Sequence, residues 1–267
     1  MMPSFVAGVG ATAERSVAYV GGLAQLFGKS LRLLLFSPLR RSRGLNRAVH
    51  QAMVAGVGAV PIVSLITFFV GVIIALQGAY QLQRLGAIQL VASLVSISIT
   101  RELGPLVTAI VVIGRSGSAF AAEIGTMRVT EESDALETMA LDPVAFLVVP
   151  KFAAMAVMMP CLAIWSDLMG VLGGCLFGVV SGNFTFGSYL IATRDVLVMH
   201  DVTTGLIKSL VFGLIITAVG CQEGFSTGAG PEEVGRSTTS AVVVSILMVI
   251  VVDLVFTMLF YVARGSS

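Results

Sequence analysis

Between Arg47 and Arg84 the chain contains no Asp, Glu, Lys or Arg. A transmembrane helix needs about 20 consecutive, mostly apolar residues, and this stretch exceeds that length. The rest of the chain has the same character, because 56% of its 267 residues are hydrophobic and only 12% are charged. A soluble domain carries about 25% charged residues. The sequence therefore predicts an all-α integral membrane protein.

Five membrane spans are predicted from the spacing of apolar runs and charges. They form one domain over residues 1–267 and cover residues 48–80, 88–122, 152–178, 203–222 and 240–262. Pro61 is expected to kink the first span, because proline cannot donate the helical hydrogen bond. Gly114, Ser118 and Ala122 form a line of small residues that predicts a close-packing face. Residues 181–200 are expected to form a polar loop.

An amphipathic helix over residues 12–36 is predicted to lie in the membrane interface. Its apolar residues recur at alternating steps of four and three, and polar residues occupy the other faces. A soluble helix packed on a partner is the alternative. Six positive residues and no acids lie between Lys29 and Arg47, which predicts that this segment is cytoplasmic. No positive region precedes it that would mark a cleavable signal peptide. Five spans then place the C-terminus on the outer side.

A polar layer is predicted within the outer half of the membrane. Asp167, Lys208 and Asp253 each lie about 22–26 Å above the expected cytoplasmic edge, at about 1.5 Å of helical rise per residue. Because charges inside membranes are costly, Lys208 is expected to pair with Asp253 or with Asp167. Arg101 and Glu102 on the second span are expected to join the layer. The alternative is that each charge reaches the outer interface separately.

A short acidic helix is predicted over residues 125–141, on the cytoplasmic side. Residues 125–143 contain five acids and a single base, Arg128, and Thr130 is a candidate N-cap. The negative cytoplasmic leaflet repels such a segment, so a protein partner with basic walls suits it better. An ordinary solvated loop helix is the alternative.

The sequence gives no sign of a catalytic or cofactor site. The segment at residues 21–30, GGLAQLFGKS, has five residues between its glycines where a P-loop has four, and no strand precedes it. The three cysteines lie in apolar runs without a CxxC pair, and the only histidines are His50 and His200. We therefore expect no metal, no bound cofactor and no enzymatic activity in this chain.

The central motifs resemble those of the permease subunit of MCE-type lipid ABC transporters, the MlaE/YrbE family. The matching segments are RELGPLVTA at 101–109, GRSGSAFAAEIGTMRVTEESDALETMALDP at 114–143, VVPKF at 148–152, IKSLVFG at 207–213, VGRSTTSAVVVS at 234–245 and VVDLVFT at 251–257. One departure is the turn GFSTGAGPEEVG, which is more acidic than the family pattern leads us to expect.

The resemblance implies a homodimeric, non-catalytic permease of the bacterial inner membrane. It implies that ATP is bound by a separate cytoplasmic ABC ATPase subunit. It also implies a periplasmic MCE-domain protein and, in many members, a STAS-domain protein as partners. The implied substrate is lipid, commonly phospholipid moved between inner and outer membranes, which maintains outer-membrane asymmetry. No nucleic acid is expected as a partner.

The resemblance also assigns candidate site residues. Those expected to contact the ATPase are Glu123, Gly125, Thr126, Met127, Arg128, Glu131, Glu132, Asp134, Leu136, Met139 and Asp142. Those expected to line a lipid cavity at the dimer interface are Ile74, Gln81, Leu82, Leu85, Arg101 and Glu102. Arg101 is expected to attract a lipid phosphate, or else to form an ion pair within the polar layer.

Two other functions remain as alternatives. The first is an ion-coupled secondary transporter that uses Asp167, Lys208 and Asp253 as a proton relay. Inverted repeats would favour it, and the sequence has no convincing internal repeat. The second is an intramembrane lipid enzyme, for which no cluster of catalytic residues is present.

Overall fold

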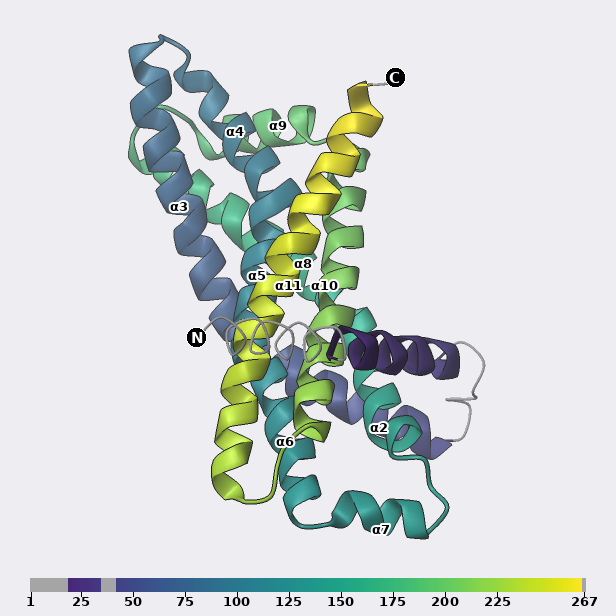
Figure 1. Cartoon of the computed structure of the whole chain (residues 1–267). Helices are drawn as coiled ribbons and strands as arrows, with labels where there is room; N and C mark the ends of the chain where they lie inside the picture. The colour runs from purple at the N-terminus through teal and green to yellow at the C-terminus, as the bar shows by residue number, and fades with distance from the viewer. Residues whose placement is uncertain (1–18, 35–41, 266–267) are drawn as a thin grey trace, which may run out of the picture.

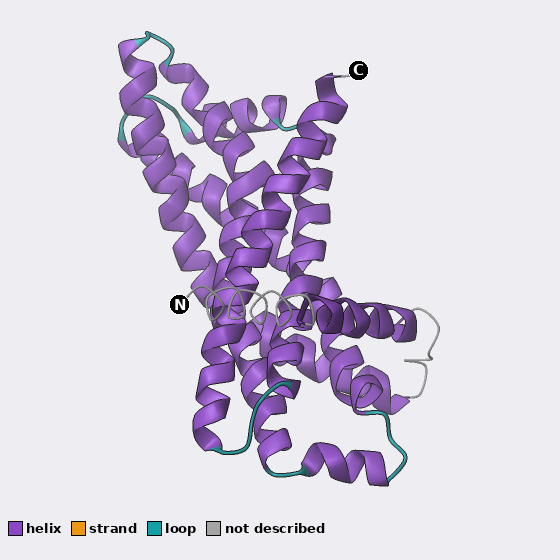
Figure 2. Cartoon of the chain, viewed as in Figure 1, coloured by secondary structure: helices purple, strands orange, loops and turns teal. Residues whose placement is uncertain are grey.

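A computed structural model describes residues 19–34 and 42–265 of the chain. These residues are helical nearly throughout and contain no strand (Figure 2). Five helical stretches are long and apolar enough to cross a membrane. They run over Leu45–Arg84, Ile88–Val129, Val144–Val180, Met199–Phe225 and Pro231–Val262. The predicted all-α membrane protein with five spans is confirmed.

The first two spans are built from several helical pieces that follow one another without a loop. The first consists of α2 (Ser42–Gln51), η1 (Ala52–Gly56), η2 (Val57–Ala59) and α3 (Val60–Arg84). The second consists of η3 (Ile88–Leu90), α4 (Val91–Ser98), η4 (Ile99–Leu103), α5 (Gly104–Val112), η5 (Ile113–Gly117) and α6 (Ser118–Val129). The remaining elements are α7 (Glu132–Thr138), η6 (Val144–Val148), α8 (Val149–Val180), α9 (Phe186–Val196), α10 (Met199–Phe225) and α11 (Pro231–Gly265).

Three of the irregular segments lie directly before a proline. A π-helical or 3-10 turn precedes Pro61 of α3, Pro105 of α5 and Pro150 of α8, and each proline occupies the first turn of its helix. Proline has no N–H to donate to the preceding turn, so the hydrogen-bond ladder has to rearrange there. The π segment η4 contains Arg101 and Glu102, and the proline after it therefore sets their local geometry.

Glycines bring the helices into close contact. A Cβ on Gly71 of α3 would lie 1.9 Å from the Gly170 carbonyl oxygen of α8, and one on Gly173 would lie 2.1 Å from the Phe68 carbonyl oxygen. The two helices thus pack backbone against backbone, as small residues allow in membranes.

On the predicted close-packing face of the second span, Gly114 has no neighbour among the described residues of this chain, since an added Cβ would meet nothing within 4 Å. The packing face lies instead on the line of Gly117, Ala121 and Gly125, which is buried. A Cβ on Gly220 of α10 would come within 2.8 Å of the Gly117 carbonyl oxygen. Small residues occur on both lines, and only the packing of α10 decides between them.

The last helix, α11, has one narrow line of buried contact residues. Ser237, Ala241, Ser245 and Val249 recur every four residues and are buried. The other faces carry exposed apolar side chains such as Leu247 and Leu254. In Figure 1 this yellow helix runs obliquely across the bundle from α6 to the C-terminus. Its apolar surface is suited to lipid or to a second membrane helix.

The described part of the predicted interfacial helix, residues 19–34, is helical and lies across the direction of the long helices (Figure 1). The rest of that prediction, residues 12–18 and 35–36, lies outside the described residues. Leu23, Leu26 and Phe27 pack on the core formed by α6, α8 and α10, where the Phe27 and Phe152 rings are 5.9 Å apart. Val20, on the predicted apolar stripe, is exposed.

The same helix lies against the end of α10. A Cβ on Gly22 would approach the Gln222 amide to 3.0 Å. Burial, together with the carboxylate of Glu223, raises the pKa of the Tyr19 phenol, so that this group stays neutral. At the other end of the helix, Lys29 forms an ion pair with Asp142 at 2.8 Å. Residues 19–34 therefore connect the end of α10 with the segment that follows α7.

The predicted polar loop over residues 181–200 is wrong, because α9 occupies most of it. Thr185 caps this helix by accepting from the Ser188 N–H, and the Ser188 hydroxyl accepts from the Thr185 N–H. This reciprocal capping box satisfies two N–H groups that have no helical partner. Tyr189 is fully buried against Phe184, which holds α9 on the bundle.

Candidate functional site

Lys208 of α10 is fully buried inside the membrane region and is surrounded by polar groups from two other helices. Its Nζ lies 2.9 Å from Asp253 Oδ1 of α11 and donates a hydrogen bond to Thr257 Oγ1 at 2.8 Å. It also donates to Glu102 Oε2 of η4. The Thr257 hydroxyl in turn donates to Glu102 Oε1 at 3.2 Å. We call these four residues, Glu102, Lys208, Asp253 and Thr257, the intramembrane ion cluster.

The contacts within this cluster differ in kind. Asp253 Oδ1 has no partner in hydrogen-bond geometry, so its contact with Lys208 is an ion pair. The cluster holds one cation and two carboxylates, and a buried charge without a partner would be strongly destabilising. Asp253 is one of the two partners that the sequence predicted for Lys208, and Glu102 joins them as expected.

Asp167 does not belong to the cluster. Its carboxylate lies against Gly104, where an added Cβ would come within 2.0 Å of Asp167 Oδ1. It lines a separate apolar cavity of about 300 Å³ between α8, α9 and the start of α10. The third member of the predicted layer therefore occupies a similar height but a different side of the second span.

Arg101, the residue next to Glu102, is held by an acid that the sequence reasoning did not single out. Its Nε lies 3.4 Å from Asp201 Oδ1, and Asp201 is buried at the start of α10. Asp201 precedes Lys208 by seven residues, or two helical turns, so both lie on the same face of α10. This seven-residue spacing was the sequence signal from which Asp201 could have been found. Thr257 follows Asp253 by four residues on α11 and could have been found in the same way.

The predicted lipid-cavity stripe divides into two pairs. Ile74 and Leu82 are partly buried and pack on the core formed by α3, α4, α8 and α9. Gln81 and Leu85 are exposed at the end of α3, and Leu85 is 77% exposed. The end of α3 and its connection to α4 project beyond the neighbouring helices in Figure 1. Only the second pair is open to a ligand within this chain.

At the end of the second span, α6 leads directly into α7. Thr130 is not the N-cap of α7: its hydroxyl donates to the Thr126 carbonyl, and Glu131 takes the capping position with φ at 59°. A left-handed residue there turns the chain sharply, and α7 runs across the end of the bundle (Figure 1). Ser133 and Leu136, which both belong to α7, are buried.

The residues predicted to contact the ATPase therefore serve two roles. Gly125 is buried against Thr227, and Met127 packs on the core formed by α6, α8 and α10, so both help to hold α6 and α7 in place. Six others are exposed, two at the end of α6 (Thr126 and Arg128) and four on α7 or at its ends (Glu131, Glu132, Asp134 and Met139). Met139 is 62% exposed, an apolar side chain at the edge of this acidic surface.

Glu123 belongs to a different contact. Its Oε2 accepts from Lys151 Nζ at 2.7 Å, and only 1% of the Lys151 side chain is exposed. Lys151 also lies 5.1 Å from the centre of the Phe120 ring. The structure buries Lys151 between α6 and α8. Within residues 19–34 and 42–265, no group of three His, Cys, Asp or Glu side chains could hold a metal ion.

Comparison with known proteins agrees with this arrangement. Residues 48–259 match the family model described as Permease MlaE. The chain is 42% identical over 217 residues to a probable ABC transporter permease protein of Rickettsia prowazekii, which covers 81% of this chain and 84% of the relative. It is 38% identical over 225 residues to a probable ABC transporter permease protein of Synechocystis, covering 84% and 86%.

A plant relative is more distant. The chain is 35% identical over 199 residues to the chloroplastic protein TRIGALACTOSYLDIACYLGLYCEROL 1 of Arabidopsis thaliana, covering 74% of this chain and 57% of that protein. The family match covers all five spans except the ends of the first and the last. The chain belongs to the MlaE family of ABC transporter permeases.

Proposed function

We propose that this chain is the membrane subunit of a lipid transporter whose ATP hydrolysis takes place on a separate ABC ATPase. One observation carries the proposal: the second span is an unbroken helical stretch that joins Glu102 of the intramembrane ion cluster to the acidic helix α7. A partner that moves α7 thereby acts on a helix that also holds the buried lysine. An ATPase partner is what membership in an ABC permease family implies.

The proposed substrate is a lipid. The name of the Arabidopsis relative refers to a glycerolipid, trigalactosyldiacylglycerol. The exposed apolar residues at the end of α3 and along α11 suit a hydrophobic cargo or a second copy of the chain. We propose phospholipid, carried through a cavity between two copies, with Gln81 and Leu85 among the lining residues.

The proposed setting is the inner membrane of a bacterium, with the N-terminus in the cytoplasm and the C-terminus in the periplasm. In this orientation α7 faces the ATPase, and the end of α3 faces a periplasmic MCE-domain protein. A STAS-domain protein on the ATPase is proposed as a further partner. The chain itself would bind neither ATP nor another cofactor. The ion cluster then serves to join η4, α10 and α11 rather than to relay protons.

Charge reversal on α7 tests the proposal. In the triple variant Glu131→Lys, Glu132→Lys and Asp134→Lys, the exposed acidic surface becomes basic while the buried Leu136 is kept. We expect the ATPase to be lost from the purified complex, because like charges across an interface cost several kcal/mol. ATP-driven transfer of a fluorescent phospholipid out of proteoliposomes should fall to background.

The matched control is Glu232→Lys with Glu233→Lys, which reverses two acids at the start of α11 instead. This variant should keep the ATPase bound. A triple variant that folds and still co-purifies with the ATPase would refute the docking role of α7. Transport by the chain alone in a proton gradient would instead support the secondary transporter.

A further inference from the structure

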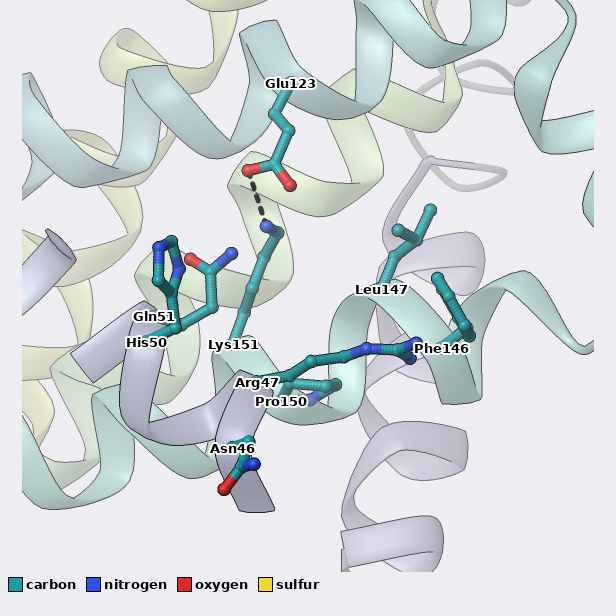
Figure 3. A pocket seen from close by; sticks show the side chains of 9 residues that line it. All are labelled: Asn46, Arg47, His50, Gln51, Glu123, Phe146, Leu147, Pro150 and Lys151. Carbon is teal, nitrogen blue, oxygen red and sulfur yellow. Dashed lines mark hydrogen bonds and ion pairs between the residues drawn. The ribbon is translucent and has the colours of Figure 1, made fainter. Parts of the chain in front are cut away.

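A cavity of about 320 Å³ lies at the cytoplasmic end of the first three spans, between α2, α6 and the start of α8 (Figure 3). It is lined by Asn46, Arg47, His50, Gln51, Glu123, Phe146, Leu147, Pro150 and Lys151. The predicted lipid-cavity residues Ile74–Leu85 lie at the opposite end of the first span. The cavity is therefore separate from the proposed transport path.

Arg47 is the main cation of this cavity. Its guanidinium carbon lies 3.6 Å from the centre of the Phe146 ring, and Figure 3 shows the side chain extending from α2 to that ring. Stacking occupies the flat face of the guanidinium and leaves its N–H groups, which lie in the plane of the group, able to donate. No ion pair to Arg47 occurs among the residues that the structure describes.

The charge balance of the cavity is positive. Glu123 is its one acid, and this carboxylate is already bound to Lys151 at 2.7 Å. Arg47 is left without a compensating charge, and His50 and the amide groups of Asn46 and Gln51 add further possible donors at the exposed mouth. A ligand that satisfies these donors has to carry negative charge and several acceptor oxygens.

The opposite wall is apolar. Phe146, Leu147 and Pro150 come from η6 and the first turn of α8, next to the core on which residues 19–34 pack. If residues 19–34 lie in the membrane interface as predicted, the cavity lies at the depth of the inner-leaflet head groups. A phosphate with an apolar attachment matches both walls.

We propose that this cavity binds a phosphate group, with Arg47 as the bidentate donor and His50 as a second donor at the mouth. Arginine matches the geometry of phosphate oxygens with two parallel hydrogen bonds. The phosphate could belong to an inner-leaflet phospholipid or to a soluble anion. This inference does not depend on the lipid-transport proposal, since a bound head group here would be a fixed ligand and not the cargo.

Ligand-dependent melting of the purified full-length chain in an uncharged detergent tests the site. Three probes are titrated: dihexanoyl phosphatidylglycerol, dihexanoylglycerol without phosphate, and inorganic phosphate. Arg47→Gln and His50→Gln are compared with the wild type. The matched control is Arg84→Gln, since Arg84 also stacks on an exposed ring, that of Tyr80, at 4.4 Å and at the far end of the same span.

We expect phosphatidylglycerol to raise the melting temperature saturably, with about tenfold weaker apparent affinity in Arg47→Gln and unchanged affinity in Arg84→Gln. Saturation by inorganic phosphate with the same dependence on Arg47 identifies a soluble anion as a ligand, and a response to the phospholipid alone identifies a head-group site. His50→Gln, a change at an exposed position, decides the outcome if Arg47→Gln does not fold.

Two results would overturn the proposal. One is that Arg47→Gln and His50→Gln bind phosphatidylglycerol as tightly as Arg84→Gln does. The other is that dihexanoylglycerol binds with the same affinity and the same dependence on Arg47, which would make the cavity an apolar pocket without phosphate recognition. Lipid transport by the complex is measured separately, so its failure would leave this result unaffected.

Discussion

At the scale of single residues, the intramembrane ion cluster is the feature with the largest energetic consequence. Lys208 is fully buried, and Glu102, Asp253 and Thr257 surround its amine. The pairing with Asp253 could be predicted because helical rise is constant, so equal distances from one membrane edge imply equal height. The position of Asp167 could not, since height says nothing about which side of a helix a residue faces.

Replacement of Lys208 should show how much stability the pairing of charges in the cluster provides. Lys208→Met leaves Glu102 and Asp253 close together without a cation, and we expect a loss of about 3–5 kcal/mol in the free energy of unfolding. The double variant Lys208→Met with Asp253→Asn should recover part of that loss, because one buried carboxylate is removed. Unfolding in sodium dodecyl sulfate, followed by circular dichroism, measures both. Equal stability of the single and the double variant would contradict the pairing.

At the scale of helices, close contact between backbones explains why so many glycines lie in the spans. The period of small residues predicted a packing face on the second span, but two parallel lines of small residues were available there. The structure uses Gly117, Ala121 and Gly125, because these face α10. A pattern within one helix cannot identify its neighbour. The helix α9 was missed for a different reason, because its capping box uses Ser188 at the position where Glu or Gln is usual.

Two glycine substitutions should therefore have different effects on the stability of the fold. Gly71→Ala places a methyl group 1.9 Å from the Gly170 carbonyl oxygen, so α3 and α8 have to separate. We expect destabilisation by about 1–3 kcal/mol. Gly114→Ala meets nothing within 4 Å and should be neutral or stabilising by up to about 1 kcal/mol through helix propensity. Melting temperatures in detergent compare the two, and a destabilised Gly114→Ala would indicate a packing partner outside this chain.

At the scale of the whole molecule, the sequence predicted the number of spans and the acidic surface correctly, since both follow from composition and charge alone. It did not predict how far the helices extend beyond a membrane of about 30 Å. The second span alone runs over Ile88–Val129, and its last part, α6, leads into α7 at the end of the bundle. Length of this kind depends on contacts with residues 19–34 and with η6, which lie far away in the sequence.

The proposed orientation has a direct test. Alkaline phosphatase is active only outside the cytoplasm, so a fusion at the C-terminus should be active, and one at the N-terminus should be inactive. The positive residues between Lys29 and Arg47 give the physical reason, because they resist transfer across the membrane. A second fusion after Gly182, in the connection between α8 and α9, should also be active. The reverse pattern would place α7 on the outer side and rule out ATPase docking there.

The narrow contact line of α11 has a consequence for how this helix can change over evolution. Ser237, Ala241, Ser245 and Val249 follow one another at four-residue steps, and the same line continues to Asp253 and Thr257 of the ion cluster. Between these residues, Val242 and Ile246 still pack on the core, whereas exposed positions such as Val243 and Leu247 can exchange one apolar residue for another, as far as lipid alone is concerned. Along the line itself, a larger side chain near Ala241 would push the helix outward. Sequence change on α11 is thus confined to its exposed positions, and the buried line preserves the alignment that brings Asp253 to Lys208.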